Sequence, residues 1–119
     1  LPDNQPEYLS IATMLVNTND AFTGVNALSV GSLGVGESIS FTAGSYDAGT
    51  EQNSEQQLTI PGPASSGEGE GFNQARDDID MVAMHPGVVT MDDGLSTSVL
   101  TQAHRFDNPT IKVSISRLE

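Results

Sequence analysis

The clearest pattern in the chain is a strict alternation of apolar and polar residues near its C-terminal end. In residues 110–118, Ile111, Val113 and Ile115 are separated by polar side chains, and residues 37–46 alternate in the same way. Successive side chains of a strand point to opposite faces of a sheet, so a period of two indicates a strand with one buried face. Both stretches are therefore predicted to be strands.

The first apolar stretch has a different spacing. Its apolar residues fall three and four positions apart, and they are Tyr8, Leu9, Ile11, Ala12, Leu15 and Val16. This spacing is typical of one face of a helix, which predicts a short N-terminal helix over residues 5–16. The sequence Asn-Thr-Asn-Asp at residues 17–20 is predicted to end it, because these side chains bond their own backbone in turns.

Shorter apolar runs predict the remaining elements. Residues 24–30 are predicted to form a strand that pairs with residues 37–46 in an antiparallel hairpin, across a glycine-rich turn. Residues 79–84 and 88–91 predict further strand segments. Residues 95–103 predict a loop with at most one helical turn, because their serines and threonines disfavour a longer helix.

Several short strands with one helix predict a mainly β fold, an antiparallel β-sandwich. With 119 residues and no cysteine, the chain has the size of a single domain, residues 1–119. No apolar run is long enough for a membrane-spanning helix. The chain begins at Leu1, without Met, in a polar segment, which predicts a processed or truncated start from which a leader has been removed.

The charge balance narrows the choice of partners. Sixteen acidic residues against four basic ones give a net charge of −12. Nucleic acids and anionic membranes are disfavoured, because both require clustered Lys and Arg. Cations and basic partners are favoured, and solubility in a salty environment explains the acidity equally well.

A candidate metal site lies where the strand of residues 37–46 ends. The turn that follows has the sequence Asp-Ala-Gly-Thr-Glu, which places Asp47 and Glu51 four positions apart. Carboxylate oxygens on a tight turn suit a hard cation such as calcium. Isolated acidic turns are also common without any metal.

The sequence Tyr-Asp-Ala-Gly-Thr-Glu at residues 46–51 resembles a motif of the spondin N-terminal domain family. Residues 17–22, the Ile-Pro-Gly-Pro of residues 60–63, and residues 104–109 are similar to further pieces of that family in order and spacing. The resemblance spans residues 7–118. The family normally begins with strands ahead of the helix, and here those strands are expected to be absent or supplied by something else.

The resemblance implies a C2-like β-sandwich that holds calcium (Ca2+) in loops at one end. Asp20 and Asp47 match acidic positions of the family, whereas Glu51 stands where the family has Asp. We therefore expect Asp20, Asp47 and Glu51 to bind calcium that is mainly structural. The resemblance further implies a bacterial protein, secreted, periplasmic or on the cell surface, that acts in adhesion or protein interaction without catalysis. The alternative is a calcium-dependent carbohydrate-binding module.

Other polar groups have less specific patterns. A second acidic set consists of Asp77, Asp78, Asp80, Asp92 and Asp93, which are interpreted as two solvated turns. Residues 52–78 predict a surface loop, or alternatively a segment that closes over the metal site or a partner. His85 and His104 are interpreted as turn residues; a His/Asp hydrolase is the third alternative, but no nucleophile elbow or HExxH motif accompanies them.

Overall fold

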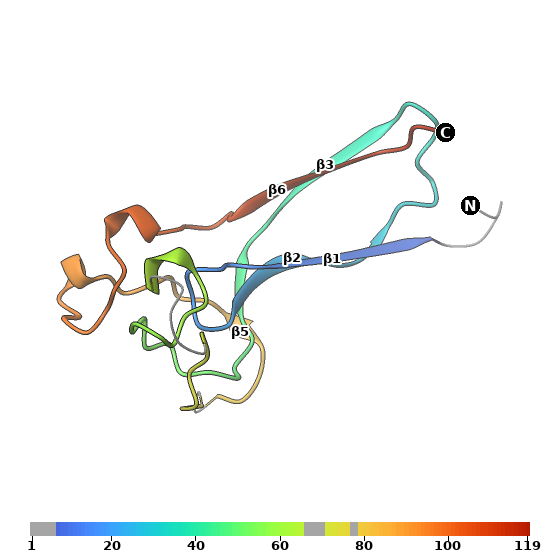
Figure 1. Cartoon of the computed structure of the whole chain (residues 1–119). Coiled ribbons are helices and arrows are strands. Elements are labelled where there is room, and N and C mark those ends of the chain that lie inside the picture. Colours follow the sequence, from blue (N-terminus) through green and yellow to red (C-terminus); the bar gives the residue numbers. More distant parts are fainter. Residues whose placement is uncertain (1–6, 66–70, 77–78) are drawn as a thin grey trace.

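The computed structural model describes residues 7–65, 71–76 and 79–119, whose strands form two antiparallel sheets (Figure 1). The four-stranded sheet has the order β1-β2-β4-β5, with β1 at Tyr8–Met14, β2 at Ala21–Ser29, β4 at Ser45–Asp47 and β5 at Ala83–Met84. The two-stranded sheet pairs β3 (Ser38–Ala43) with β6 (Ile111–Ser116). Three single turns of 3-10 helix are η1 (Pro63–Ser65), η2 (Met91–Asp93) and η3 (Gln102–His104). The prediction of a mainly β, antiparallel fold is confirmed.

The sheet formed by β3 and β6 has one apolar and one polar face. Opposed residues across the ladder share a face, and the apolar pairs are Ile39 with Ile115, Phe41 with Val113, and Ala43 with Ile111. On the other face the hydroxyl groups of Ser38 and Ser116 lie 2.7 Å apart, as do those of Ser40 and Ser114. The two strands predicted from alternation are thus confirmed, and they pair with each other.

The stretch predicted as one strand over residues 37–46 divides at Gly44 between the two sheets. β3 pairs with β6, whereas β4 pairs with the start of β2 through Ala21 with Asp47 and Phe22 with Tyr46. The predicted hairpin of residues 24–30 with residues 37–46 is therefore wrong, because residues 24–29 pair with β1 instead. In Figure 1, β2 and β3 diverge beyond this point. Strands that pass between sheets form the corners of sandwiches; the sandwich itself stays a prediction.

The predicted N-terminal helix over residues 5–16 is wrong in its described part. Tyr8–Met14 is the strand β1, which pairs antiparallel with β2 and has a register shift between Leu9 and Ile11. The apolar residues that fit helical spacing also fit alternation, since Leu9 and Ile11 are half-buried while Tyr8, Ser10 and Ala12 are exposed. Pairing with β2 satisfies the backbone of these residues and decides between the two patterns.

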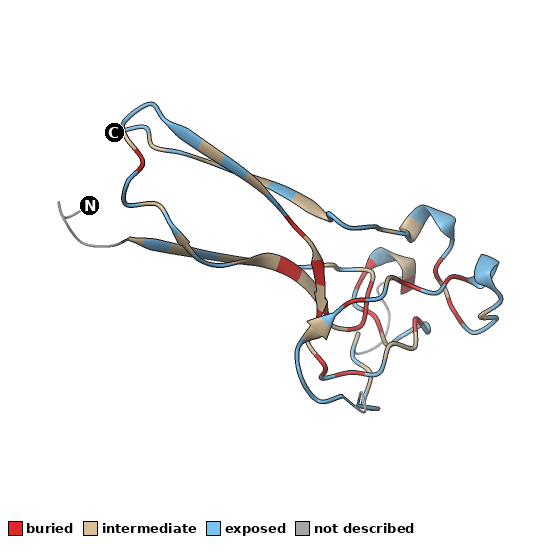
Figure 2. Cartoon of the chain, turned by 180° about the vertical axis from the view of Figure 1, so that it is seen from behind, coloured by how far each residue is buried: buried red, intermediate tan, exposed pale blue. Residues whose placement is uncertain are grey.

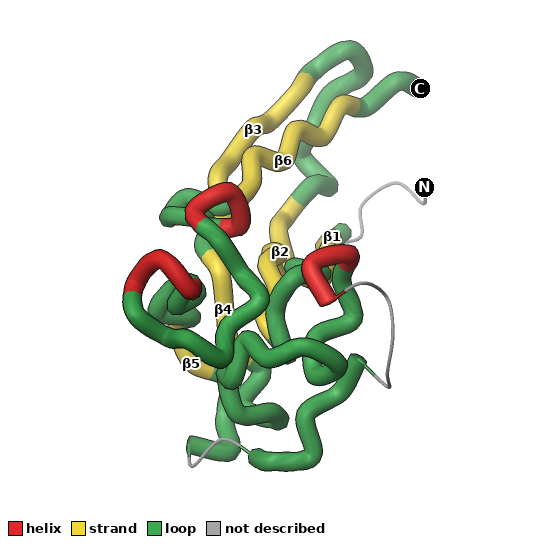
Figure 3. The backbone as a smooth tube through the Cα atoms, turned by 60° about the vertical axis from the view of Figure 1, so that its left-hand side comes forward, coloured by secondary structure: helices red, strands yellow, loops and turns green. Residues whose placement is uncertain are grey.

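The best-buried apolar cluster lies among the loops and not between the strands. Ile60, Val88 and Leu100 are buried together, and Ala64, Val99 and Phe106 pack against them. Figures 2 and 3 show these loops gathered around the β4–β5 end, with buried residues concentrated there. The prediction that residues 52–78 form only a surface loop is wrong for Ile60, which is fully buried; residues 66–70 and 77–78 lie outside the described residues.

Two other predicted strands are shorter or absent. In residues 79–84 only Ala83–Met84 pairs, and Ile79, Met81 and Val82 are exposed. Residues 88–91 form no strand: Val88 joins the buried cluster, and Met91 begins η2. A turn of 3-10 helix at Gln102–His104 agrees with the single helical turn predicted near residues 95–103. Within the described residues, no helix has the length and apolar character needed to cross a membrane.

Candidate functional site

The turn after β4 is held by the carboxylate of Asp20, which lies just before β2. Asp20 Oδ2 accepts hydrogen bonds from the backbone nitrogen of Thr50 at 2.7 Å, from its hydroxyl at 2.7 Å, and from the backbone nitrogen of Glu51 at 2.9 Å. Asp20 Oδ1 is buried and has no hydrogen-bond partner among the described residues. The structure thus brings Asp20 to the Asp-Ala-Gly-Thr-Glu turn, as the sequence predicted, with one carboxylate oxygen unused.

Asp47 is the last residue of β4, and its side chain bonds to the backbone of the same turn. Its side chain is buried, Oδ1 accepts from the backbone nitrogen of Gly49 at 2.7 Å, and Oδ2 accepts from the side-chain amide of Asn53. Gly49 has a φ of +71°, and a Cβ atom placed on it would lie 2.3 Å from the carbonyl oxygen of Met81. The turn therefore requires glycine both for its left-handed backbone and for the close approach of residue 81.

Glu51 is the third predicted ligand, and it is 7% exposed. Its Oε2 accepts from the backbone nitrogen of Asn73 at 2.8 Å. Burial raises the pKa of Glu51 above its usual value, and the neighbouring Asp20 carboxylate adds to the rise, while hydrogen bonds from Asn73 and Asn19 oppose it.

Two asparagines that sequence reasoning did not assign to the site hold its surroundings in place. Asn19 is 2% exposed; its Oδ1 accepts from the backbone of Ser54 and Glu55, and its Nδ2 donates to the carbonyl of Thr59 at 2.9 Å. Asn108 Oδ1 accepts from the backbone nitrogen of Ser45 at 2.9 Å, at the start of β4.

Both asparagines lie in stretches that carried the family resemblance, residues 17–22 and 104–109. Asn19 ties residues 17–22 to the loop of residues 54–59, and Asn108 ties residues 104–109 to the start of β4. The signal that could have found them is the resemblance itself, since an isolated Asn predicts only a turn.

The three acids do not converge on one point in the way that a preformed site would require. Within the described residues, no group of three or more His, Cys, Asp or Glu side chains is placed to hold a metal ion. Asp20 Oδ2, both carboxylate oxygens of Asp47 and Glu51 Oε2 already accept hydrogen bonds from protein groups. The donor chemistry nevertheless fits calcium, because a hard cation takes carboxylate oxygens and Asp20 Oδ1 is a buried acceptor without a donor.

The second acidic set does not gather into a site. Asp80 forms an exposed ion pair with Arg76, and Asp92 accepts from the backbone nitrogen of Gln102. Asp93 accepts from the backbone and hydroxyl of Thr90 and from Arg105. These acids order local turns, in agreement with the turn interpretation; Asp77 and Asp78 lie outside the described residues.

The two histidines occupy turns. His104 Nδ1 accepts from the backbone nitrogen of Thr101 at 3.0 Å. His85 is 4% exposed, packs its ring against Phe106, and accepts at Nδ1 from the backbone nitrogen of Gly87 at 3.0 Å. Burial lowers the pKa of His85, and the acids Asp47 and Asp20 partly oppose this. With Nδ1 accepting, the proton of the neutral ring lies on Nε2, which is buried and has no hydrogen-bond partner among the described residues.

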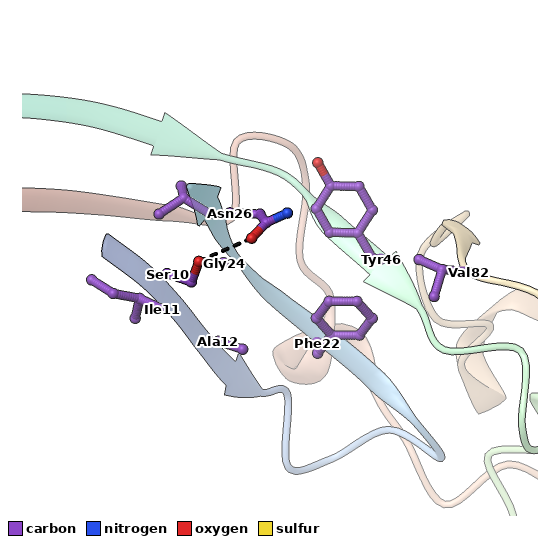
Figure 4. Close-up of a pocket in the computed structure, with 9 residues that line it drawn as sticks. Ser10, Ile11, Ala12, Phe22, Gly24, Asn26, Tyr46 and Val82 are labelled. Atoms are coloured by element: carbon purple, nitrogen blue, oxygen red, sulfur yellow. Dashed lines mark hydrogen bonds between the residues drawn. The ribbon is translucent and has the colours of Figure 1, made fainter. Parts of the chain in front are cut away.

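A separate pocket of about 470 Å3 lies on the other face of the four-stranded sheet (Figure 4). Asp47 and Tyr46 are consecutive strand residues, so their side chains point to opposite faces. Phe22 and Tyr46 stand next to each other across β2 and β4, with ring centroids 5.6 Å apart. The side chains that line it include Ser10, Ala12, Phe22, Asn26, Tyr46 and Val82.

The fold and site define an antiparallel β protein whose acidic turn is tied to a preceding loop by Asp20. Comparison with protein-family models, with curated proteins and with solved structures finds no match to this chain. The spondin resemblance and the role that it implies therefore stay predictions.

Proposed function

We propose that the chain binds calcium at the β4 turn, with Asp20 as the principal ligand and with Asp47 and Glu51 as its acidic neighbours. The observation that carries this proposal is Asp20 Oδ1, a buried carboxylate oxygen without a hydrogen-bond donor. Such an oxygen is costly to bury unless a donor or a cation compensates it. No Lys or Arg side chain forms an ion pair with these three acids in the described part of the chain.

The role of calcium is mainly structural in this proposal. Asp20 precedes β2, and the Asp47–Glu51 turn follows β4, so a cation between them would fasten two adjacent strands at the end where the loops gather. Backbone carbonyls and water would complete the oxygen ligands. Together with the resemblance of residues 46–51, this supports an extracellular module for adhesion or protein interaction, secreted or at the cell surface.

A calcium-dependent carbohydrate-binding module is the alternative. In such a module the sugar hydroxyls would have to reach the ion, yet the aromatic pair Phe22 and Tyr46 lies on the sheet face opposite to Asp47. A glycan array with and without calcium separates the two functions. Calcium-dependent glycan binding would favour the alternative over the adhesion module.

Thermal unfolding of the full chain in calcium and in a chelator, at fixed ionic strength, tests calcium binding. A ligand at ~100 times its Kd adds about 2.7 kcal/mol to the free energy of unfolding. For a domain of this size the expected rise in Tm is several degrees or more. Magnesium at the same concentration should give a much smaller rise, because it demands a stricter octahedral geometry.

The matched pair Asp20→Asn and Asp92→Asn assigns the effect to the site. Both replacements remove one negative charge, but only Asp20 has the unused buried oxygen. We expect the calcium-dependent rise in Tm to disappear in Asp20→Asn and to persist in Asp92→Asn. An unchanged Tm of the native chain in millimolar calcium, or an equal loss in both variants, would disprove the proposal.

A further inference from the structure

The pocket lined by Phe22, Tyr46 and Val82 has a largely apolar floor and a polar rim. Phe22 and Tyr46 stack across β2 and β4, and Ala12 continues the floor on β1. Its volume of about 470 Å3 falls within the range of about 300–1,000 Å3 that is typical of ligand sites. This pocket, named here the Phe22–Tyr46 pocket, takes no part in the proposed calcium site.

The hydrogen bond between Ser10 on β1 and Asn26 on β2 leaves the amide nitrogen of Asn26 as a donor at the rim of the pocket. Ser10 Oγ donates to Asn26 Oδ1 at 2.9 Å and accepts from the backbone nitrogen of Ala27 at 3.0 Å. This fixes the amide of Asn26 with its oxygen toward Ser10 and its nitrogen on the side of Tyr46 (Figure 4). The amide nitrogen of Asn26 and the hydroxyl of Tyr46 are therefore available to the backbone of a bound chain.

The pocket adjoins an exposed apolar edge of the same sheet. β5, a strand of two residues, is one of the two edge strands of the four-stranded sheet within the described residues, and it pairs only with β4. Met81, Val82 and Met84 along this edge are 63%, 60% and 58% exposed. Proteins usually protect such edges with charges, prolines or a covering element, because an exposed strand edge offers its backbone to another strand. Methionine side chains adapt to varied partner surfaces.

The charge of this sheet selects the kind of partner. The strands β1, β2, β4 and β5 contain no Lys or Arg. Glu7 stands directly before β1, Asp80 near β5 is paired with Arg76, and the chain as a whole carries a net charge of −12. A segment with Lys or Arg on both sides of its apolar residue would gain from this field, whereas an acidic segment would be repelled.

We propose that the β5 edge and the Phe22–Tyr46 pocket bind an extended, basic segment of a partner protein. The segment adds as a strand beside β5 and places one large apolar side chain between Val82 and the two aromatic rings. Backbone hydrogen bonds along the edge supply affinity, and the pocket selects the anchoring side chain. The interaction goes beyond calcium binding and does not depend on it, because the pocket lies on the sheet face opposite to Asp47.

Titration of the isotope-labelled full chain with synthetic peptides, followed by NMR amide shifts, tests the proposal. The probe is Lys-Thr-Lys-Val-Phe-Val-Lys-Thr-Lys, compared with a version that has Ala in place of Phe and a version that has Glu in place of every Lys. We expect shifts at Ala12, Tyr46 and Val82 with the first peptide. The peptide without Phe should bind at least roughly tenfold more weakly, since a buried anchor dominates such interfaces. The acidic peptide should also bind at least roughly tenfold more weakly, because the negative field of the sheet repels it.

The variants Val82→Asp and Val35→Asp form a matched control. Both valines are exposed, at 60% and 66%, but Val35 lies in the loop between β2 and β3, away from the pocket. Val82→Asp should weaken the basic peptide roughly tenfold or more, and Val35→Asp should leave its binding unchanged. Val82→Thr, which keeps the side-chain volume, serves if Val82→Asp does not fold.

Binding is measured in calcium and in a chelator, so that failure of the calcium proposal remains separate. The basic peptide is expected to bind with equal affinity in calcium and in the chelator. The proposal is overturned if the basic peptide with Phe does not bind, or if Val35→Asp weakens its binding as much as Val82→Asp. It is also overturned if neutral glycans, and not peptides, shift the resonances of the pocket.

Discussion

Asp20 and Thr50, 30 residues apart in the sequence, are joined by two hydrogen bonds of 2.7 Å from the backbone and hydroxyl of Thr50 to one carboxylate oxygen. The same oxygen accepts from Glu51. A single side chain before β2 therefore fixes the turn that follows β4. This contact is independent of any cation, so Asp20 has a structural role in addition to the proposed role as a ligand.

Replacing Asp20 should destabilise the chain even when calcium is absent. Asp20→Ala removes three hydrogen bonds to an ionised acceptor, and hydrogen bonds to charged groups contribute about 1.5–3 kcal/mol each to stability in favourable cases. We expect a loss of about 2 kcal/mol or more in the free energy of unfolding, measured by urea denaturation in a chelator. Asp92→Ala removes one bond from an exposed turn and should cost less; equal losses would contradict the structural role of Asp20.

Gly49 should tolerate substitution much less well than another glycine with left-handed backbone. Gly94 has a φ of +98° and open space around its Cβ position, so Gly94→Ala should cost about 1–2 kcal/mol of backbone strain. Gly49→Ala adds a Cβ atom 2.3 Å from the carbonyl oxygen of Met81, which forces the backbone to move. We expect a clearly larger loss of stability in Gly49→Ala by urea denaturation. Similar losses in the two variants would show that residue 81 moves away freely.

Glu55 should oppose folding at neutral pH. Burial raises the pKa of Glu55 above its usual value of 4.5, opposed by a hydrogen bond from the backbone of Val89. A raised carboxyl pKa means that the unfavourable contribution develops as the pH rises through that pKa, and is relieved as the pH falls. Glu55→Gln keeps an oxygen for Val89 and should raise the free energy of unfolding at pH 7, by a margin that shrinks toward pH 4. A variant less stable than the native chain at neutral pH would contradict this.

The contribution of Asp93 to stability should depend on pH in the opposite way to that of Glu55. Hydrogen bonds from the backbone and hydroxyl of Thr90, with help from Arg105, lower the pKa of Asp93 from 3.8 to about 2. Its stabilising contribution is therefore complete above 3.8 and is lost as the pH falls through about 2. An NMR titration of the carboxyl carbon should give a midpoint near 2. A midpoint at the ordinary value would mean that the contacts with Thr90 do not persist in solution.

The strands were predictable where alternation was strict and long. Ile111, Val113 and Ile115 predicted β6, and Ile39 and Phe41 predicted β3, because a ladder with one apolar face leaves no other periodicity. Residues 8–16 contain apolar residues at both helical and alternate spacing, and the sequence alone favoured the wrong one. What decided the outcome was pairing with β2, a contact that no local pattern encodes.

The candidate site was predictable in part. The sequence identified Asp20, Asp47 and Glu51, and the structure brings Asp20 to the turn of the other two. It did not predict that backbone amides of the turn would occupy one oxygen each of Asp20 and Asp47, since those bonds depend on the left-handed turn at Gly49. Nor did it predict the Phe22–Tyr46 pocket, because two aromatic residues separated along the chain meet only across β2 and β4.

The sequence by itself determined the mainly β class, the strands with strict alternation, the acidity, and the acids from which a cation site could be built. These properties follow from local spacing and composition, which each segment carries with it. Tertiary structure alone decided that residues 8–14 form a strand, that the chain changes sheets at Gly44, and that Asp20 holds Thr50. Each of these depends on hydrogen bonds between distant segments, which form only when the whole chain is folded.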